Sequence, residues 1–415
     1  MNLLKTSMLT AISTLIRMIS GFIITKVISV LAGPNGLALI GQLQNIINLI
    51  MLSAGNFLQT AVTKYTAEYK DENLKKYKVW SVSLKVIFVI NIILSPLIFL
   101  FSNDISLLIL KTSEMSYLFK IFSFSMPLFV LNTLFLSIIN GLKDIKKYVS
   151  INILLSVVSL LLTTLLCYFW GIKGALISYV TNQSLVFFIT FYLVRNEKWM
   201  KLKNFKVKVD NEDYKKVLKF IIITISAILA SNLSLIVIRN NIINNLSIND
   251  AGYWQGVWSL SQVLFSFVTM TLVTYLLPTL SSIKDKNKLN KEVLNVISFT
   301  FPLIVILCLL FYFFRDIIIY LLYSSDFKLM RDLFLWQFFG IAIKLIGWVY
   351  GYVLVARGMV KYTASTEIIF AISFILISIS LIHLYGLVGV TYAFFINSVL
   401  HALTMYIIYK FKVYI

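Results

Sequence analysis

The sequence has few acidic residues and few side chains suited to metal binding or redox chemistry. Only 17 of its 415 residues are Asp or Glu, and charged residues of both signs make up 13% of the chain. Two cysteines and two histidines are too few for a disulfide framework or a metal centre. It also lacks a carboxylate pair, a nucleophile–base set and a phosphate-cradling glycine loop, so we expect no enzyme activity and no cofactor.

Apolar residues are correspondingly abundant. Hydrophobic residues make up 59% of the chain, and the mean hydropathy is +0.89. The interior of a soluble domain cannot bury so much apolar chain, so lipid must surround most of it. No cleavable signal peptide is visible, and we expect the first apolar segment itself to direct insertion.

The net charge of +20 raises the question of nucleic-acid binding. Nucleic-acid-binding domains keep their basic residues on a water-exposed polar face. Here the basic residues form short clusters between apolar segments, as the positive-inside rule describes for membrane proteins. We therefore expect membrane lipid, and no nucleic acid, as a partner.

Segment lengths predict an all-α polytopic membrane protein with about twelve transmembrane helices. Residues 315–330 remain open, because their apolar part is too short to span a bilayer and can lie in the interface. The predicted spans cover residues 8–31, 37–63, 79–102, 115–140, 149–169, 173–194, 217–244, 251–282, 293–314, 329–356, 363–384 and 387–409.

The basic residues also predict the orientation. With both termini in the cytoplasm, 26 of the 37 Lys and Arg lie in or beside cytoplasmic loops, five lie in or beside outer loops, and six lie deeper within spans. This asymmetry predicts cytoplasmic N- and C-termini.

The two halves of the sequence resemble each other. Gly171-x-x-Gly174 recurs as Gly386-x-x-Gly389, 215 residues later, and Lys147-Tyr148 recurs 214 residues later as residues 361–362. Because each half holds an even number of spans, the copies form a parallel repeat with a cavity expected between them. We predict two six-helix bundles, residues 1–208 and 209–415, with a cytoplasmic linker at 195–216. Such an architecture is typical of alternating-access transporters.

Five motifs distributed along the chain resemble those of O-antigen translocases, the Wzx-type flippases of the multidrug/oligosaccharidyl-lipid/polysaccharide exporter (MOP) superfamily. They are GPNGL at 33–37, VTKY at 62–65, WQGV at 254–257, YLLPTLS at 275–281 and MRDLFLWQ at 330–337.

The resemblance implies a MATE-like fold in a bacterial inner membrane. It implies that the cargo is an undecaprenyl-diphosphate-linked oligosaccharide, such as an O-antigen unit for lipopolysaccharide biosynthesis, moved from the cytoplasmic to the periplasmic leaflet. It also names a polysaccharide polymerase and a chain-length regulator as candidate partners. The superfamily includes drug antiporters as well, so a small-molecule antiporter and a non-transporting scaffold remain alternatives.

Basic residues inside the predicted spans are the candidates for cargo binding. Placing Lys or Arg near the bilayer centre costs about 3 kcal/mol, so each requires a partner or a function. Arg17 and Lys344 lie mid-span, whereas Lys26 and Arg239 lie nearer the outer ends, where their long side chains can reach the interface. Arg17 and Lys26 are nine residues apart, about half a turn out of phase, so a straight helix directs only one of them into a cavity.

The sign of these charges favours an anionic cargo. The six charges counted deeper within spans are all basic. Guanidinium and ammonium groups bind phosphate oxygens, whereas a cation antiporter requires carboxylates. The clearest acidic exception, Glu367, either carries a coupling proton or forms an ion pair. Coupling to a proton or a sodium gradient therefore remains open. The candidates for stacking or polar contact with sugar rings are Trp254, Gln255, Trp258 and Trp348.

The orientation can be tested with reporter fusions. Because the lysine-rich loops are predicted to stay in the cytoplasm, fusions in them should report cytoplasm and fusions in the short outer loops should report periplasm. A periplasmic signal at Lys206 would contradict both the orientation and the duplication. The cytoplasmic fusion sites are Tyr77, Lys146, Lys206 and Lys288, and the periplasmic ones are Asn35, Ser113 and Asn249.

Overall fold

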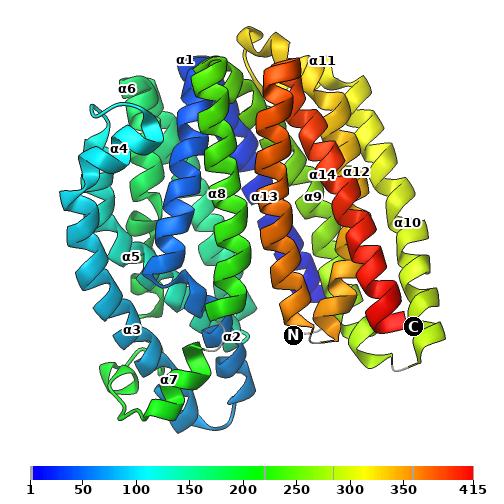
Figure 1. The fold of residues 1–415 in the computed structure, drawn as a ribbon. Coiled ribbons are helices and arrows are strands. Elements are labelled where there is room, and N and C mark those ends of the chain that lie inside the picture. Colours follow the sequence, from blue (N-terminus) through cyan, green and yellow to red (C-terminus); the bar gives the residue numbers. More distant parts are fainter. Residues whose placement is uncertain (1–2, 219–220, 284, 358, 415) are drawn as a thin grey trace. The chain divides into compact units, whose positions relative to one another are not determined.

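The computed structural model describes residues 3–218, 221–283, 285–357 and 359–414, and within these ranges it contains helices and no strands (Figure 1). The first half comprises α1 (Leu3–Ala54), η1 (Asn56–Leu58), α2 (Gln59–Glu68), α3 (Asn73–Leu100), α4 (Ser102–Leu110), α5 (Ser116–Gly141), α6 (Ile145–Val194), η2 (Leu202–Phe205) and α7 (Asn211–Leu218). The second half comprises α8 (Ile221–Asn245), α9 (Ile248–Ser282), α10 (Lys286–Phe313), α11 (Arg315–Leu322), η3 (Ser325–Leu333), α12 (Phe334–Ala356), α13 (Val360–Tyr385), α14 (Val388–Tyr409) and η4 (Lys410–Tyr414).

The helices correspond to the twelve predicted spans. Eight helices in the described ranges are long and apolar enough to cross a membrane. Two of these, α1 and α6, are each two helices joined at a glycine with positive φ, Gly33 and Gly171, so each accounts for two spans. The remaining two spans are α8 and α9, parts of which lie outside the fully described residues.

Glycine geometry explains how spans five and six reverse direction, and it recurs between spans eleven and twelve. Gly171 has φ 57° and ψ −139°, and Gly386 has φ 61° and ψ −144°, a region that side-chain-bearing residues rarely adopt. The second glycine of each motif follows three residues later. A Cβ at Gly174 would lie 1.8 Å from the Leu166 carbonyl oxygen, and a Cβ at Gly389 would lie 2.1 Å from the Leu381 carbonyl oxygen. Both glycines of the repeated motif are therefore required by the turn.

The element boundaries repeat with the same offset. Shifted by 215 residues, the first part of α6, residues 145–170, coincides with α13. The second part, residues 172–194, then coincides with α14 at its end and to within one residue at its start. The short helix α4 after the third span likewise recurs as α11 after the ninth. Residues 315–330, left open by the sequence, thus form α11 and most of η3 as the counterpart of a short helix in the first half.

The chain divides into two compact units. Unit 1 consists of Met1–Ala32 and Leu39–Ile228, and unit 2 of Gly33–Ala38 and Leu229–Ile415. The sequence placed the second bundle's start at residue 209, but in the structure the linker and α7 belong to unit 1. Lys219, at the start of the predicted seventh span, lies outside the described residues.

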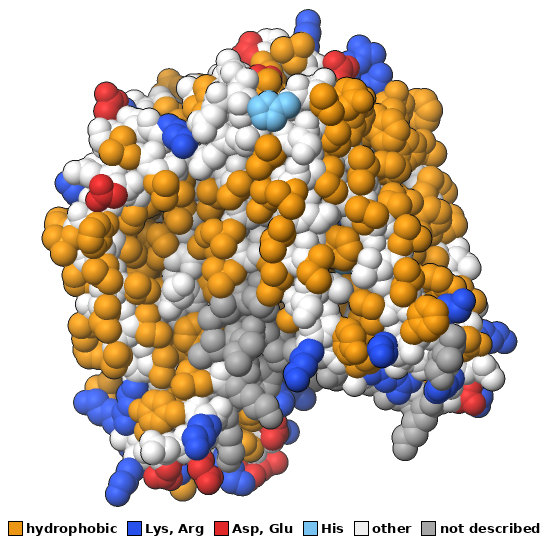
Figure 2. Space-filling model, in the orientation of Figure 1, with side chains coloured by type: hydrophobic (Ala, Val, Ile, Leu, Met, Phe, Trp, Pro, Cys, Tyr) orange, Lys and Arg blue, Asp and Glu red, His pale blue; other side chains and the backbone are white. Residues whose placement is uncertain are grey.

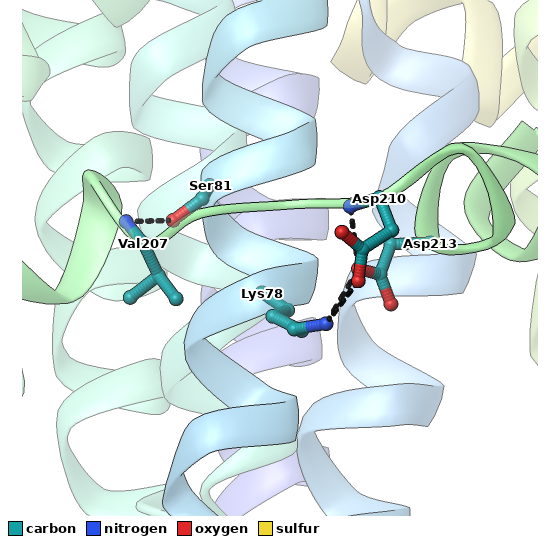
Figure 3. A network of polar contacts seen from close by, with 5 residues as sticks. All are labelled: Lys78, Ser81, Val207, Asp210 and Asp213. Atoms are coloured by element: carbon teal, nitrogen blue, oxygen red, sulfur yellow. Dashed lines mark hydrogen bonds and ion pairs between the residues drawn. The ribbon is translucent and has the colours of Figure 1, made fainter.

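The linker stays with unit 1 because polar contacts hold it against α3 (Figure 3). The Val207 N–H donates to Ser81 Oγ at 3.1 Å. Lys78 Nζ pairs with Asp210 at 2.9 Å and with Asp213 at 3.0 Å. The segment is therefore an ordered strap on this bundle.

Aromatic packing reinforces the strap. The ring of Trp80 on α3 lies 6.0 Å from Trp199 and 5.8 Å from Phe205, both in the linker. Trp80 is 1% exposed, and its indole N–H donates to Thr66 Oγ1 at 2.8 Å. A buried tryptophan with its polar atom satisfied stabilises this end of unit 1.

The surface agrees with a membrane location. Large apolar side chains on α3, including Phe88 at 65% and Ile92 at 56%, are exposed, which lipid rather than water accommodates. On the face of unit 1 in view, hydrophobic side chains cover the middle of the helices, and charged side chains gather at the end that holds α7 (Figure 2). The protein is thus a multi-pass membrane protein.

Candidate functional site

Arg239 lies inside unit 2 and does not extend to the interface as the sequence allowed. It is 1% exposed. Its guanidinium donates to Oε1 of Gln255 on α9 and lies 5.3 Å from the ring of Trp254. Gln255 in turn donates through Nε2 to Ser259 Oγ at 3.2 Å. The described contacts that hold this cation are therefore an amide and an aromatic ring.

Trp254 is completely buried, so its ring packs inside unit 2 and does not belong to an interfacial aromatic belt. Its ring lies 5.7 Å from that of Trp258. Trp258 then contacts Phe394 on α14 at 5.5 Å, edge to face, and Phe374 on α13 at 6.3 Å. An aromatic row thus leads from Arg239 into the centre of unit 2.

Lys344 lies at the other end of this aromatic row. Its Nζ is 5.3 Å from the centre of the Phe394 ring, a cation–π contact. It also interacts electrostatically with Glu367 on α13 and with His401 on α14. Two of the predicted cationic residues, Arg239 and Lys344, are therefore linked through side chains of one unit.

A pocket with a volume of about 140 Å³ lies between α12, α13 and α14. Trp348, Tyr352, Glu367 and His401 are among its lining residues. Trp348 is fixed there by edge-to-face contacts with Phe265 at 4.6 Å and Tyr352 at 5.7 Å. The pocket therefore presents both aromatic rings and ionisable groups.

Arg17 and Lys26 lie on α1 in unit 1. Arg17 is exposed and Lys26 is half-buried. Both residues belong to unit 1, whereas Arg239 and Lys344 belong to unit 2. A role of Arg17 and Lys26 in cargo binding therefore stays a prediction.

The sequence interpretation missed His401. It considered the two histidines only as metal ligands, yet His401 lies in the middle of an apolar helix and is 6% exposed. An ionisable residue inside a membrane span is itself a signal of function, and that rule would have identified it. Gly347 makes room for it, because a Cβ there would lie 2.5 Å from His401 Nδ1.

Basic side chains outnumber acidic ones in this arrangement. No group of three or more His, Cys, Asp or Glu side chains that could hold a metal ion occurs among the described residues. Arg239 and Lys344 outnumber Glu367 within the spans of unit 2. Basic groups in a low-dielectric interior bind anions strongly.

Comparison with known proteins identifies the family. A model of the family described as polysaccharide biosynthesis protein matches residues 3–284. The chain belongs to this family. Over 368 residues it is 26% identical to the lipid III flippase of Escherichia coli (strain K12), covering 89% of this chain and 88% of the relative.

Solved structures show the same fold at lower sequence identity. An inward-facing MATE-family multidrug resistance transporter of the MOP superfamily matches with a TM-score of 0.78 at 14% identity, over 95% of this chain and 94% of that one. The lipid II flippase MurJ, in an inward closed conformation, matches with a TM-score of 0.75 at 17% identity, over 98% and 87%. The prediction of an all-α, MATE-like membrane protein is confirmed, and so is its resemblance to the MOP superfamily.

The buried position of Arg239 predicts a structural cost for its removal. Arg239→Ala leaves the Gln255 carbonyl oxygen without its donor and empties buried volume, which costs about 2 kcal/mol or more. We expect a lower melting temperature of the purified protein and lower membrane abundance, while Arg239→Lys retains part of both. The half-buried Lys26→Ala is the control and should change them little. An unchanged melting temperature in Arg239→Ala would contradict a structural role for this cluster.

Proposed function

We propose that this protein is a flippase that moves an isoprenoid-diphosphate-linked oligosaccharide, of the O-antigen or a related surface polysaccharide, across the bacterial inner membrane by alternating access. The family assignment and the flippase relative support a lipid-linked saccharide as cargo. The fold supports a transport mechanism, because MATE-family transporters and a lipid II flippase share it.

The sign of the charge inside the spans carries the proposal. The clearest acidic candidate within a span, Glu367, lies near the cytoplasmic end of span eleven, whereas the basic residues Arg17 and Lys344 lie mid-span. A diphosphate requires cationic partners, and ammonium and guanidinium groups form charge-assisted hydrogen bonds to its oxygens. Because the bound cargo neutralises their charge, it lowers the free-energy cost of keeping these groups inside the membrane. A MATE-type drug antiporter, the alternative, would need carboxylates to hold a cation.

The aromatic and amide side chains of unit 2 support a saccharide on the same cargo. Trp348 and Tyr352 line a pocket beside Glu367, and aromatic rings with nearby polar groups suit the apolar faces and hydroxyls of sugars. Trp254 and Gln255 are buried in this conformation, so cargo contact by them requires unit 2 to open.

The orientation with both termini in the cytoplasm belongs to the same proposal. In that orientation, the lysine-rich linker lies on the cytoplasmic side of the membrane, from which the cargo enters. A polymerase and a chain-length regulator would meet the product on the periplasmic side.

Lys344 provides the test. If it neutralises the diphosphate, charge matters more than shape, so Lys344→Arg should keep partial function and Lys344→Gln should lose most of it. Surface polysaccharide and membrane protein abundance are measured together, with Lys85→Gln, an exposed lysine on α3, as the matched control.

Normal polysaccharide at normal abundance in Lys344→Gln would rule out the anion-binding role. It would favour the remaining alternative, a scaffold of polysaccharide assembly that does not transport.

A further inference from the structure

Two ionisable side chains of unit 2, Glu367 and His401, line one pocket, and a third, Lys344, interacts with both. Lys344 is on α12, Glu367 on α13 and His401 on α14. The other titratable side chain that lines the pocket is Tyr352 on α12. The described parts of α9 and α10, which also pack against α12, add no charged group to this lining.

Two of these groups, His401 and Glu367, are incompletely satisfied. His401 is 6% exposed, and its Nδ1 is buried without a hydrogen-bond partner among the described residues. One edge-to-face contact holds its ring against Phe370 at 5.1 Å. Glu367 has no ion pair within 4.0 Å in the described part of the chain. Nδ1 faces Gly347, which also lines the pocket, and a buried polar atom without a partner requires an explanation such as a bound proton or ligand.

We infer that Glu367 and His401 form a proton-binding site that is linked to anion binding at Lys344, an inference that rests on the proposed function. The exchangeable proton resides on a carboxylate oxygen of Glu367 or on a ring nitrogen of His401. Both groups line the same pocket, and each interacts electrostatically with Lys344.

A proton fits this site better than a sodium ion. Hard metal cations require several oxygen ligands, preferably charged ones, and the pocket supplies a single carboxylate together with the hydroxyls of Tyr352 and Thr363 and an imidazole. The ammonium of Lys344 nearby repels a second fixed cation, whereas a proton on Glu367 removes a charge instead of adding one beside it.

The sign of the linkage follows from the charges. With Glu367 ionised, Lys344 and Glu367 together carry no net charge. A diphosphate that binds Lys344 adds negative charge in a low-dielectric interior, and protonation of Glu367 or His401 offsets it. Binding of the anion therefore takes up a proton from solution, and by reciprocity a lower pH tightens anion binding.

The test uses the purified full-length protein and farnesyl diphosphate, a soluble isoprenoid diphosphate, as the probe. Isothermal titration calorimetry in buffers of different ionisation enthalpy measures the protons exchanged per probe bound. We expect proton uptake, and an affinity that rises as pH falls, by at most about tenfold per pH unit for one linked proton. Binding with no proton exchange, or with proton release, would overturn the inference while leaving the proposed function standing. Absence of binding would overturn both.

Two variants assign the proton. Glu367→Gln removes the resident anion, so it should bind the probe roughly fivefold or more tightly at pH 8 and lose most of the pH dependence. His401→Gln should reduce the part of the proton uptake that is not due to Glu367. A purely structural role for Glu367 predicts weaker, not tighter, binding. Glu212→Gln on α7 and His383→Gln at the end of α13 are matched controls, because both side chains are exposed, and they should behave as wild type.

Discussion

Charge inside an apolar bundle is the constraint on which the rest of unit 2 depends. Each buried cation must be held by other polar or aromatic groups, because lipid offers it none. Arg239 is held by Gln255 and Trp254, and Lys344 by the Phe394 ring and by electrostatic interaction with Glu367. The aromatic row between them places the two cations in one connected set of side chains.

The partners of the two cations differ in a way that matters for function. Arg239 is almost fully buried, and its amide acceptor is fixed by a further hydrogen bond to Ser259. Lys344 is half-buried and lies beside a pocket whose other ionisable groups lack close partners. A flexible ammonium on a four-carbon stem can change partners more easily than a fixed guanidinium. Lys344 is therefore the better candidate for binding and releasing a cargo, and Arg239 for holding α8 against α9.

The sequence predicted the spans and their duplication well, because apolar length and paired glycines are local signals. The Gly171 and Gly386 turns adopt matching backbone angles, as the repeated motif indicated. Side-chain environments were harder to predict. Burial of Trp254 and the position of His401 in the pocket that Glu367 also lines depend on packing between helices, which periodicity does not specify. The linker was recognised as polar, but its attachment to α3 depends on Lys78 and Trp80, about 130 residues away.

Transbilayer movement of a lipid-linked oligosaccharide is the most direct measurement of the proposed flippase activity. The purified protein is reconstituted into vesicles that hold a fluorescent isoprenoid-diphosphate-linked oligosaccharide, and the fraction accessible to a membrane-impermeant quencher is followed over time. We expect the labelled lipid to equilibrate between the leaflets much faster in vesicles that hold the protein than in protein-free vesicles. We expect Lys344→Gln to remove most of this acceleration. Movement at the protein-free rate by well-folded wild-type protein would contradict the proposed flippase activity.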